Sequence, residues 1–131
     1  TFALTDFDLH HKFDPFGKQT AFEVYQNVAR ETSVIQPLKE DYFLCTFGHI
    51  FSGGYAAGYY SYKWAEVLSA DAFSAFEEGG LEKPETIKAQ GKKFRQTVLS
   101  LGGAKHPLEV FKEFRGREPQ VDALLKQGGL I

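Results

Sequence analysis

The chain has 131 residues, of which 43% are hydrophobic, and this is enough apolar material for one compact domain with its own core. The formal charge at pH 7 is only −2, so no basic stripe is available for nucleic acid and nothing attracts an anionic membrane over long range. Cys45 is the single cysteine, which excludes a disulfide framework, and no apolar run is long enough to span a membrane.

Glycine and proline pairs divide the chain into segments that favour helix. Helices are expected, in chain order, at residues 4–13, 18–31, 55–78, 83–100, 107–114 and 119–126. Gly79 and Gly80 should end the long helix, and residues 41–52 are expected to form a loop or short extended structure. Strand-like alternation is scarce. The expected fold class is therefore mainly α, with residues 1–131 forming one multi-helix domain.

A row of tyrosines opens the expected long helix. At 100° per residue, Tyr55, Tyr59 and Tyr62 fall on one side, with Tyr60 opposite, and about 10 Å would separate Tyr55 from Tyr62 along the axis. A neutral phenol donates a hydrogen bond and can stabilise the oxyanion that forms when water attacks a carbonyl. Tyrosines at helical spacing are also common core residues with bonded hydroxyls. The pattern alone leaves both interpretations open.

His49 stands shortly before Gly53 and Gly54. Each glycine costs about 1 kcal/mol of helix stability relative to alanine, so the pair indicates a close backbone approach or motion. A histidine here is either structural or a hydrogen-bond donor to a substrate carbonyl. His10 and His11 are adjacent and point about 100° apart on a helix, so they cannot easily face one metal.

Other polar residues have simpler interpretations. The sequence contains no HExxH and no CxxC spacing, so no metal site is expected within it. His106 stands beside Pro107 and is expected at a helix start, while Asp71, Glu77 and Glu78 are expected to be solvated or helix-capping charges. A chain that has no methionine and begins at Thr1 is expected to be a fragment or a processed product.

Residues 47–62 read Phe-Gly-His-Ile-Phe-Ser-Gly-Gly-Tyr-Ala-Ala-Gly-Tyr-Tyr-Ser-Tyr. This segment resembles the glycine- and tyrosine-rich segment of the thimet-oligopeptidase family and looks closest to its oligopeptidase A branch. The resemblance continues through residues 64–73 and 111–119 and extends upstream to residues 8–10 and 13–15, so it covers nearly the whole chain. It implies a zinc metallopeptidase that cuts short peptides in a deep channel between two mostly helical halves.

The resemblance also implies individual roles. His49 and Tyr55 would contact the substrate backbone, Tyr62 would help stabilise the tetrahedral intermediate, and Tyr59 would line the same wall. The loop at Gly53 and Gly54 would be mobile and close on substrate. The family's zinc ligands belong to an HExxH segment and a downstream Glu, which are expected to lie upstream of this chain. The isolated chain is therefore expected to be inactive.

Two alternatives remain open. One is a free-standing helical module that binds peptides or a partner protein without catalysis. The other is an excised fragment that self-associates through the channel wall of Tyr55, Tyr59 and Tyr62. The expected partners of the parent enzyme are short peptides, with no nucleic acid and no membrane. The expected location is the cytoplasm, or an organelle lumen in a eukaryote.

Overall fold

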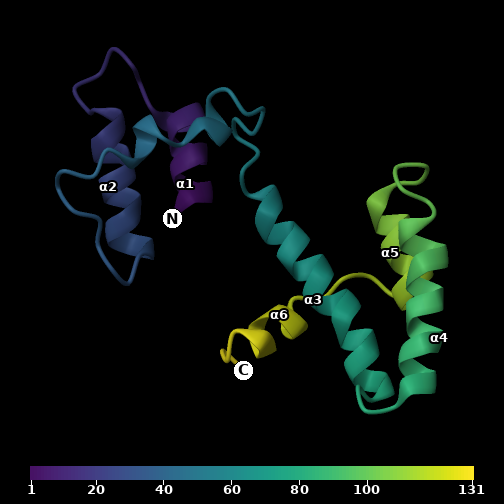
Figure 1. Ribbon diagram of the computed structural model, residues 1–131. Coiled ribbons are helices and arrows are strands. Elements are labelled where there is room, and N and C mark those ends of the chain that lie inside the picture. The colour runs from purple at the N-terminus through teal and green to yellow at the C-terminus, as the bar shows by residue number, and fades with distance from the viewer. The chain divides into compact units, whose positions relative to one another are not determined.

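A computed structural model describes residues 1–131, which form two compact units, Thr1–Tyr62 and Lys63–Ile131. The secondary structure consists of six α-helices with short helical turns and contains no strand (Figure 1), so the predicted mainly α class is confirmed. None of the helices combines the length and the apolar character needed to cross a membrane. The assignment of residues 1–131 to one domain of a peptidase stays a prediction.

The first unit contains α1 (Phe2–Phe7), which continues into a π-helical turn (Asp8–Lys12), and α2 (Ala21–Thr32). Both predicted helices are confirmed. A capping box fixes the start of α2: the Thr20 hydroxyl accepts the Glu23 N–H at 3.2 Å, and the Glu23 carboxylate accepts the Thr20 N–H at 2.7 Å. Such a cap contributes about 1 kcal/mol.

Two 3-10 turns, Phe43–Cys45 and Gly48–Ile50, occupy the region predicted as loop or extended structure. They carry part of the core of the first unit, in which Tyr25, Leu44, Phe47 and Ile50 are buried together. Phe43 and Phe47 have ring centroids 4.8 Å apart. Aromatic pairs of this kind add about 0.5–1.5 kcal/mol beyond their burial. The core therefore anchors the backbone that leads into the glycine-rich loop.

Helix α3 (Ser61–Gly79) begins at Ser61, so the predicted start at Tyr55 is wrong. Residues 56–60 form turns, and Ala57 has a φ of +54°, which is incompatible with a right-handed helix. The predicted end is confirmed, because the helix stops at Gly79 and Gly80 has a φ of +89°.

The second unit continues from α3 into α4 (Pro84–Phe94) with a π-helical end (Arg95–Leu99), α5 (Pro107–Arg115) and α6 (Asp122–Gln127). The three predicted helices are confirmed, although α6 starts at Asp122. Helices α4 and α5 lie side by side (Figure 1), with Phe94 and Phe114 in edge-to-face contact. His106 caps α5 as predicted, because its Nδ1 accepts the Leu108 N–H at 3.2 Å.

Candidate functional site

A tightly wound loop carries the predicted site residues in the first unit. The carbonyl of Gly48 accepts the N–H groups of Ser52 and Gly53, each at 2.9 Å, and the carbonyl of His49 accepts the Tyr55 N–H at 3.0 Å. A Cβ atom on Gly53 would lie 2.8 Å from the His49 Cα, which is closer than real Cβ atoms approach. Gly54 has a φ of +82°. Both glycines are therefore required by local geometry, and the predicted close backbone approach is confirmed at Gly53.

His49, Tyr55, Tyr59 and Tyr62 come together in one group, called here the aromatic cluster. The ring centroids of Tyr55 and Tyr62 are 5.3 Å apart, and those of Tyr59 and Tyr62 are 4.9 Å apart. The His49 ring lies 5.9 Å from Tyr55 and 5.7 Å from Tyr59. The predicted helical row is wrong, because Tyr55 and Tyr59 precede the helix. The turn nevertheless brings Tyr55 and Tyr62 closer than the predicted helix would.

The aromatic cluster is anchored at one end and open at the other. Tyr59 is half-buried, and its ring meets Phe47 of the core edge-on at 4.9 Å. Tyr55 and Tyr62 remain 37% and 41% exposed, and His49 is exposed as well. Tyr60 lies outside the aromatic cluster, and its ring packs on Phe7 with the ring centroids 5.4 Å apart. Two phenols and one imidazole therefore stand on an accessible surface, where they can donate hydrogen bonds to a ligand.

The neighbouring phenols affect the acidity of Tyr62. A side-chain hydrogen bond with Tyr55 raises the pKa of Tyr62 above its ordinary value. Partial desolvation and the proximity of the Tyr55 and Tyr59 hydroxyls raise this pKa further. Tyr62 is therefore a neutral hydroxyl, and hence a potential donor, at neutral and mildly alkaline pH.

The turn that precedes α3 is held by Asp6, a residue of α1 that is fully buried. Its Oδ1 accepts the Ala57 N–H at 2.9 Å, and its Oδ2 accepts the Tyr59 N–H at 2.9 Å. The Nδ1 atom of His10 lies 2.8 Å from Asp6 Oδ1. Sequence reasoning missed Asp6. The only available signal was its i,i+4 spacing to His10, which is common on helix surfaces.

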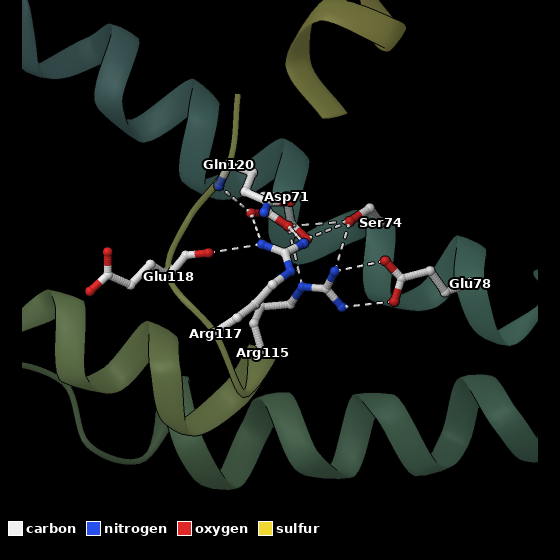
Figure 2. A network of polar contacts seen from close by, with 7 residues as sticks. All are labelled: Asp71, Ser74, Glu78, Arg115, Arg117, Glu118 and Gln120. Carbon is white, nitrogen blue, oxygen red and sulfur yellow. Dashed lines mark hydrogen bonds and ion pairs between the residues drawn. The ribbon is translucent and has the colours of Figure 1, made fainter. Parts of the chain in front are cut away.

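A second polar group missed by sequence reasoning lies in the second unit (Figure 2). Asp71 was expected to be a solvated or helix-capping charge, but its side chain is only 1% exposed and it lies in the interior of α3, so that expectation is wrong. Arg117 binds both carboxylate oxygens of Asp71, at 2.6 and 2.7 Å, and the Gln120 N–H donates to the carboxylate at 2.7 Å. Arg115, 7% exposed, also contacts Asp71 at 3.3 Å. These residues are called here the Asp71 network.

The partners of Asp71 decide its charge. Burial by itself would raise the pKa of Asp71, but hydrogen bonds from Arg117 and Gln120 and the adjacent guanidinium charges outweigh burial and hold the pKa below its ordinary value. Glu78 is exposed as expected, and it is paired with Arg115, whose hydrogen bonds lower the pKa of Glu78. The network fastens the segment after α5 to α3.

No three His, Cys, Asp or Glu side chains within residues 1–131 come together in a way that could hold a metal ion. The residues present in this chain therefore do not by themselves fit a zinc site.

Comparison with known proteins gives a consistent result over the whole chain. The model of the protein family described as peptidase family M3 matches residues 1–130. The chain is 61% identical over 130 residues to the probable cytosolic oligopeptidase A of Arabidopsis thaliana and 59% identical to its organellar oligopeptidase A, chloroplastic/mitochondrial. It is 46% identical over 129 residues to oligopeptidase A of Escherichia coli K12. These alignments cover 98–99% of this chain but only 16–18% of the relatives.

Proposed function

Because this chain belongs to peptidase family M3, we propose that it forms the C-terminal helical part of a zinc oligopeptidase of the oligopeptidase A type, which hydrolyses short peptides. The chain spans less than a fifth of the relatives' length, so this activity is proposed for the longer protein. The zinc ligands and the water-activating base are assigned to other parts of that protein. Its proposed location is the cytoplasm or an organelle lumen, in keeping with the names of the two plant relatives.

The observation that carries the proposed role of this chain is the exposed side of the aromatic cluster. His49, Tyr55 and Tyr62 lie on that side, and the Tyr55 ring contacts both the His49 ring and the Tyr62 ring. A peptide substrate presents carbonyl oxygens along its backbone, and imidazole and phenol groups donate hydrogen bonds to such acceptors. We assign His49 and Tyr55 to binding of the peptide backbone, with Tyr59 supporting the wall from its half-buried position.

Tyr62 is assigned to the oxyanion that develops when water attacks the scissile carbonyl. Its hydroxyl is neutral, and its partly exposed ring is held by contacts with Tyr55 and Tyr59, so the donor can be placed before the reaction begins. A donor placed in advance stabilises the charge of the transition state without reorganisation. Loss of one such donor typically costs about 2.7–4 kcal/mol of transition-state stabilisation. Gly53 and Gly54 are assigned to the substrate-binding loop, whose closure on a peptide stays a proposal.

The test is Tyr62→Phe in the full-length protein. The substitution removes one hydroxyl and keeps the ring contacts with Tyr55 and Tyr59, so folding should change little. We expect kcat to fall by about 10²–10³-fold. KM should move much less, because the interaction is made mainly in the transition state.

Tyr60→Phe is the matched control. Tyr60 is equally exposed, at 43%, but its ring packs on Phe7 outside the aromatic cluster, so kcat should stay within about twofold of the parent. Equal kcat values for the parent and Tyr62→Phe would remove Tyr62 from the mechanism. A large loss of stability in Tyr62→Phe would instead identify its hydroxyl as a structural hydrogen bond.

A further inference from the structure

One buried ionisable group of the first unit has no part in the proposed mechanism. The carboxylate of Asp6 accepts the N–H groups of Ala57 and Tyr59, which lie 51 and 53 positions further along the chain. These two bonds connect α1 to the turn between Tyr55 and α3. Hydrogen bonds to a charged acceptor are stronger than those between neutral groups, so two of them together can decide the conformation of a short turn.

The third neighbour of the carboxylate is His10. Its Nδ1 lies 2.8 Å from Asp6 Oδ1 and 2.9 Å from the Asp6 carbonyl oxygen. Both oxygens are acceptors, so Nδ1 must carry a proton. Asp6 is thus surrounded by three N–H donors, and no buried side-chain oxygen or nitrogen in the chain lacks a partner. The carboxylate is fixed in position as well as buried.

The turn held by Asp6 has an unfavourable backbone conformation. Ala57 adopts a φ of +54°, in the left-handed region that is unfavourable for a non-glycine residue. The bond from the Ala57 N–H to Asp6 offsets this cost. The second bond removes the Tyr59 N–H from helix formation, because a helix extended back to Tyr55 would use that N–H to reach the Tyr55 carbonyl.

The alternative conformation is the one that the sequence pattern itself favours. Tyr55, Tyr59 and Tyr62 have helical spacing, and in a helix begun at Tyr55 the first and last of them would be separated by about 10 Å along the axis. In the observed turn their ring centroids are 5.3 Å apart. The difference decides whether Tyr55 stacks on Tyr62 or moves out of contact.

We propose that Asp6 is a positioning residue for the aromatic cluster. By accepting the Ala57 and Tyr59 N–H groups it stops α3 at Ser61 and keeps Tyr55, Tyr59 and Tyr62 in contact. The catalytic consequence rests on the proposed function, since Asp6 acts through Tyr62 and touches no substrate. The structural part of the proposal, the tether itself, stands without any peptidase activity.

The first experiment measures the tether directly by amide hydrogen exchange in the full-length protein, with mass-spectrometric peptides that cover residues 55–60. In the unsubstituted protein the Ala57 and Tyr59 amides should be protected although they lie in a turn. Rapid exchange of both amides would overturn the proposal without any variant. Asp6→Asn keeps the shape of the side chain but replaces one acceptor by an NH₂ group, so exchange in residues 55–60 should accelerate at least about tenfold.

Asp8→Asn is the matched control on the same stretch of helix. Asp8 pairs only with Lys12, at 2.8 Å, and does not contact the turn. Its replacement should leave exchange in residues 55–60 and the value of kcat unchanged. Unchanged exchange in a folded Asp6→Asn variant would contradict the tether.

The second experiment is a double-mutant cycle on kcat. Asp6→Asn should lower kcat about tenfold or more in the parent background but much less in the Tyr62→Phe background, because the hydroxyl that Asp6 positions is already gone. Equal fold losses in the two backgrounds would reduce Asp6 to general stability and overturn its positioning role. If the unsubstituted protein has no peptidase activity, the proposed function fails, and the exchange experiment still decides the tether.

Discussion

At the scale of single residues, the acidity of Tyr62 links geometry to pH dependence. Its pKa lies above the ordinary phenol value of about 10, first because of the hydrogen bond with Tyr55. A raised pKa means that Tyr62 keeps its proton, and therefore its donor function, further into the alkaline range. Any alkaline loss of kcat that comes from ionisation of Tyr62 should accordingly lie above about pH 10.

Tyr55→Phe should move that alkaline limb to lower pH. Removing the Tyr55 hydroxyl takes away the largest cause of the raised pKa, so Tyr62 should ionise nearer its ordinary value. Initial rates at saturating peptide, measured from neutral pH upward, give the position of the limb. The same limb should be missing from the small residual activity of Tyr62→Phe. An alkaline limb that stays in place in Tyr55→Phe would show that Tyr62 does not set it.

At the scale of elements, local sequence rules predict most helices well. Helical spacing and glycine and proline boundaries place α2, α4 and α5 to within a few residues, because these signals act between near neighbours. The start of α3 could not be predicted in this way. It depends on Asp6, which is 51 positions away from the N–H that it binds. A local pattern contains no information on that contact.

The burial of Asp71 could not be predicted from its local sequence either. Asp71 follows Glu66 by five residues and, from the sequence, looks like an ordinary surface acid of α3. Its burial follows from Arg115, Arg117 and Gln120, which lie 44–49 positions later in the sequence and close over it only in the folded unit (Figure 2). The aromatic cluster was identified because its residues fall within one short segment of high similarity, although the predicted helical geometry was wrong.

Asp71→Asn should therefore destabilise the second unit strongly. The change removes the carboxylate that Arg117 binds through both oxygens and that Arg115 contacts, and disruption of a buried ion pair costs about 3–5 kcal/mol. Urea unfolding of the full-length protein, followed by a probe in the second unit, measures the loss. Glu77→Gln is the control, because Glu77 is exposed and its replacement should stay within about 0.5 kcal/mol. Similar midpoints for the two variants would contradict a structural role of Asp71.

The acid dependence of the same unit has a defined sign. Because the pKa of folded Asp71 is depressed, its contribution to stability is present above the unfolded value of about 4 and is lost as pH falls through the folded value. Glu78 acts in the same direction, since its pKa is lowered by Arg115. The urea concentration at the unfolding midpoint of the parent should thus decrease when the pH is lowered below about 4. This decrease should be smaller in Asp71→Asn.

At the scale of the whole molecule, all residues assigned to the proposed function lie in the first unit. The first unit holds the aromatic cluster and the Asp6 tether, and the second is held by the Asp71 network. The family match covers both units, from residue 1 to residue 130. Self-association through Tyr55, Tyr59 and Tyr62 stays a prediction, for which the exposure of Tyr55 and Tyr62 is a precondition.

The last prediction concerns the activity of the 131-residue chain by itself. In the proposed function, this chain supplies donors for the substrate and the oxyanion, whereas the zinc ligands and the base are assigned to the rest of the protein. Donors alone cannot generate the attacking nucleophile, because a water molecule needs a metal or a base to be activated at neutral pH. The purified 131-residue chain should therefore show no peptide cleavage that a chelator inhibits, even with added zinc.

The measurement compares the 131-residue chain with the full-length protein on one fluorogenic peptide, with and without chelator. The full-length protein should cleave the peptide, lose activity with the chelator and regain it with zinc. A Tyr62→Phe version of the short chain serves as the control for a contaminating protease, whose activity would be the same in both preparations. Chelator-sensitive cleavage by the short chain that disappears in its Tyr62→Phe version would contradict the assignment of the zinc ligands to the rest of the protein.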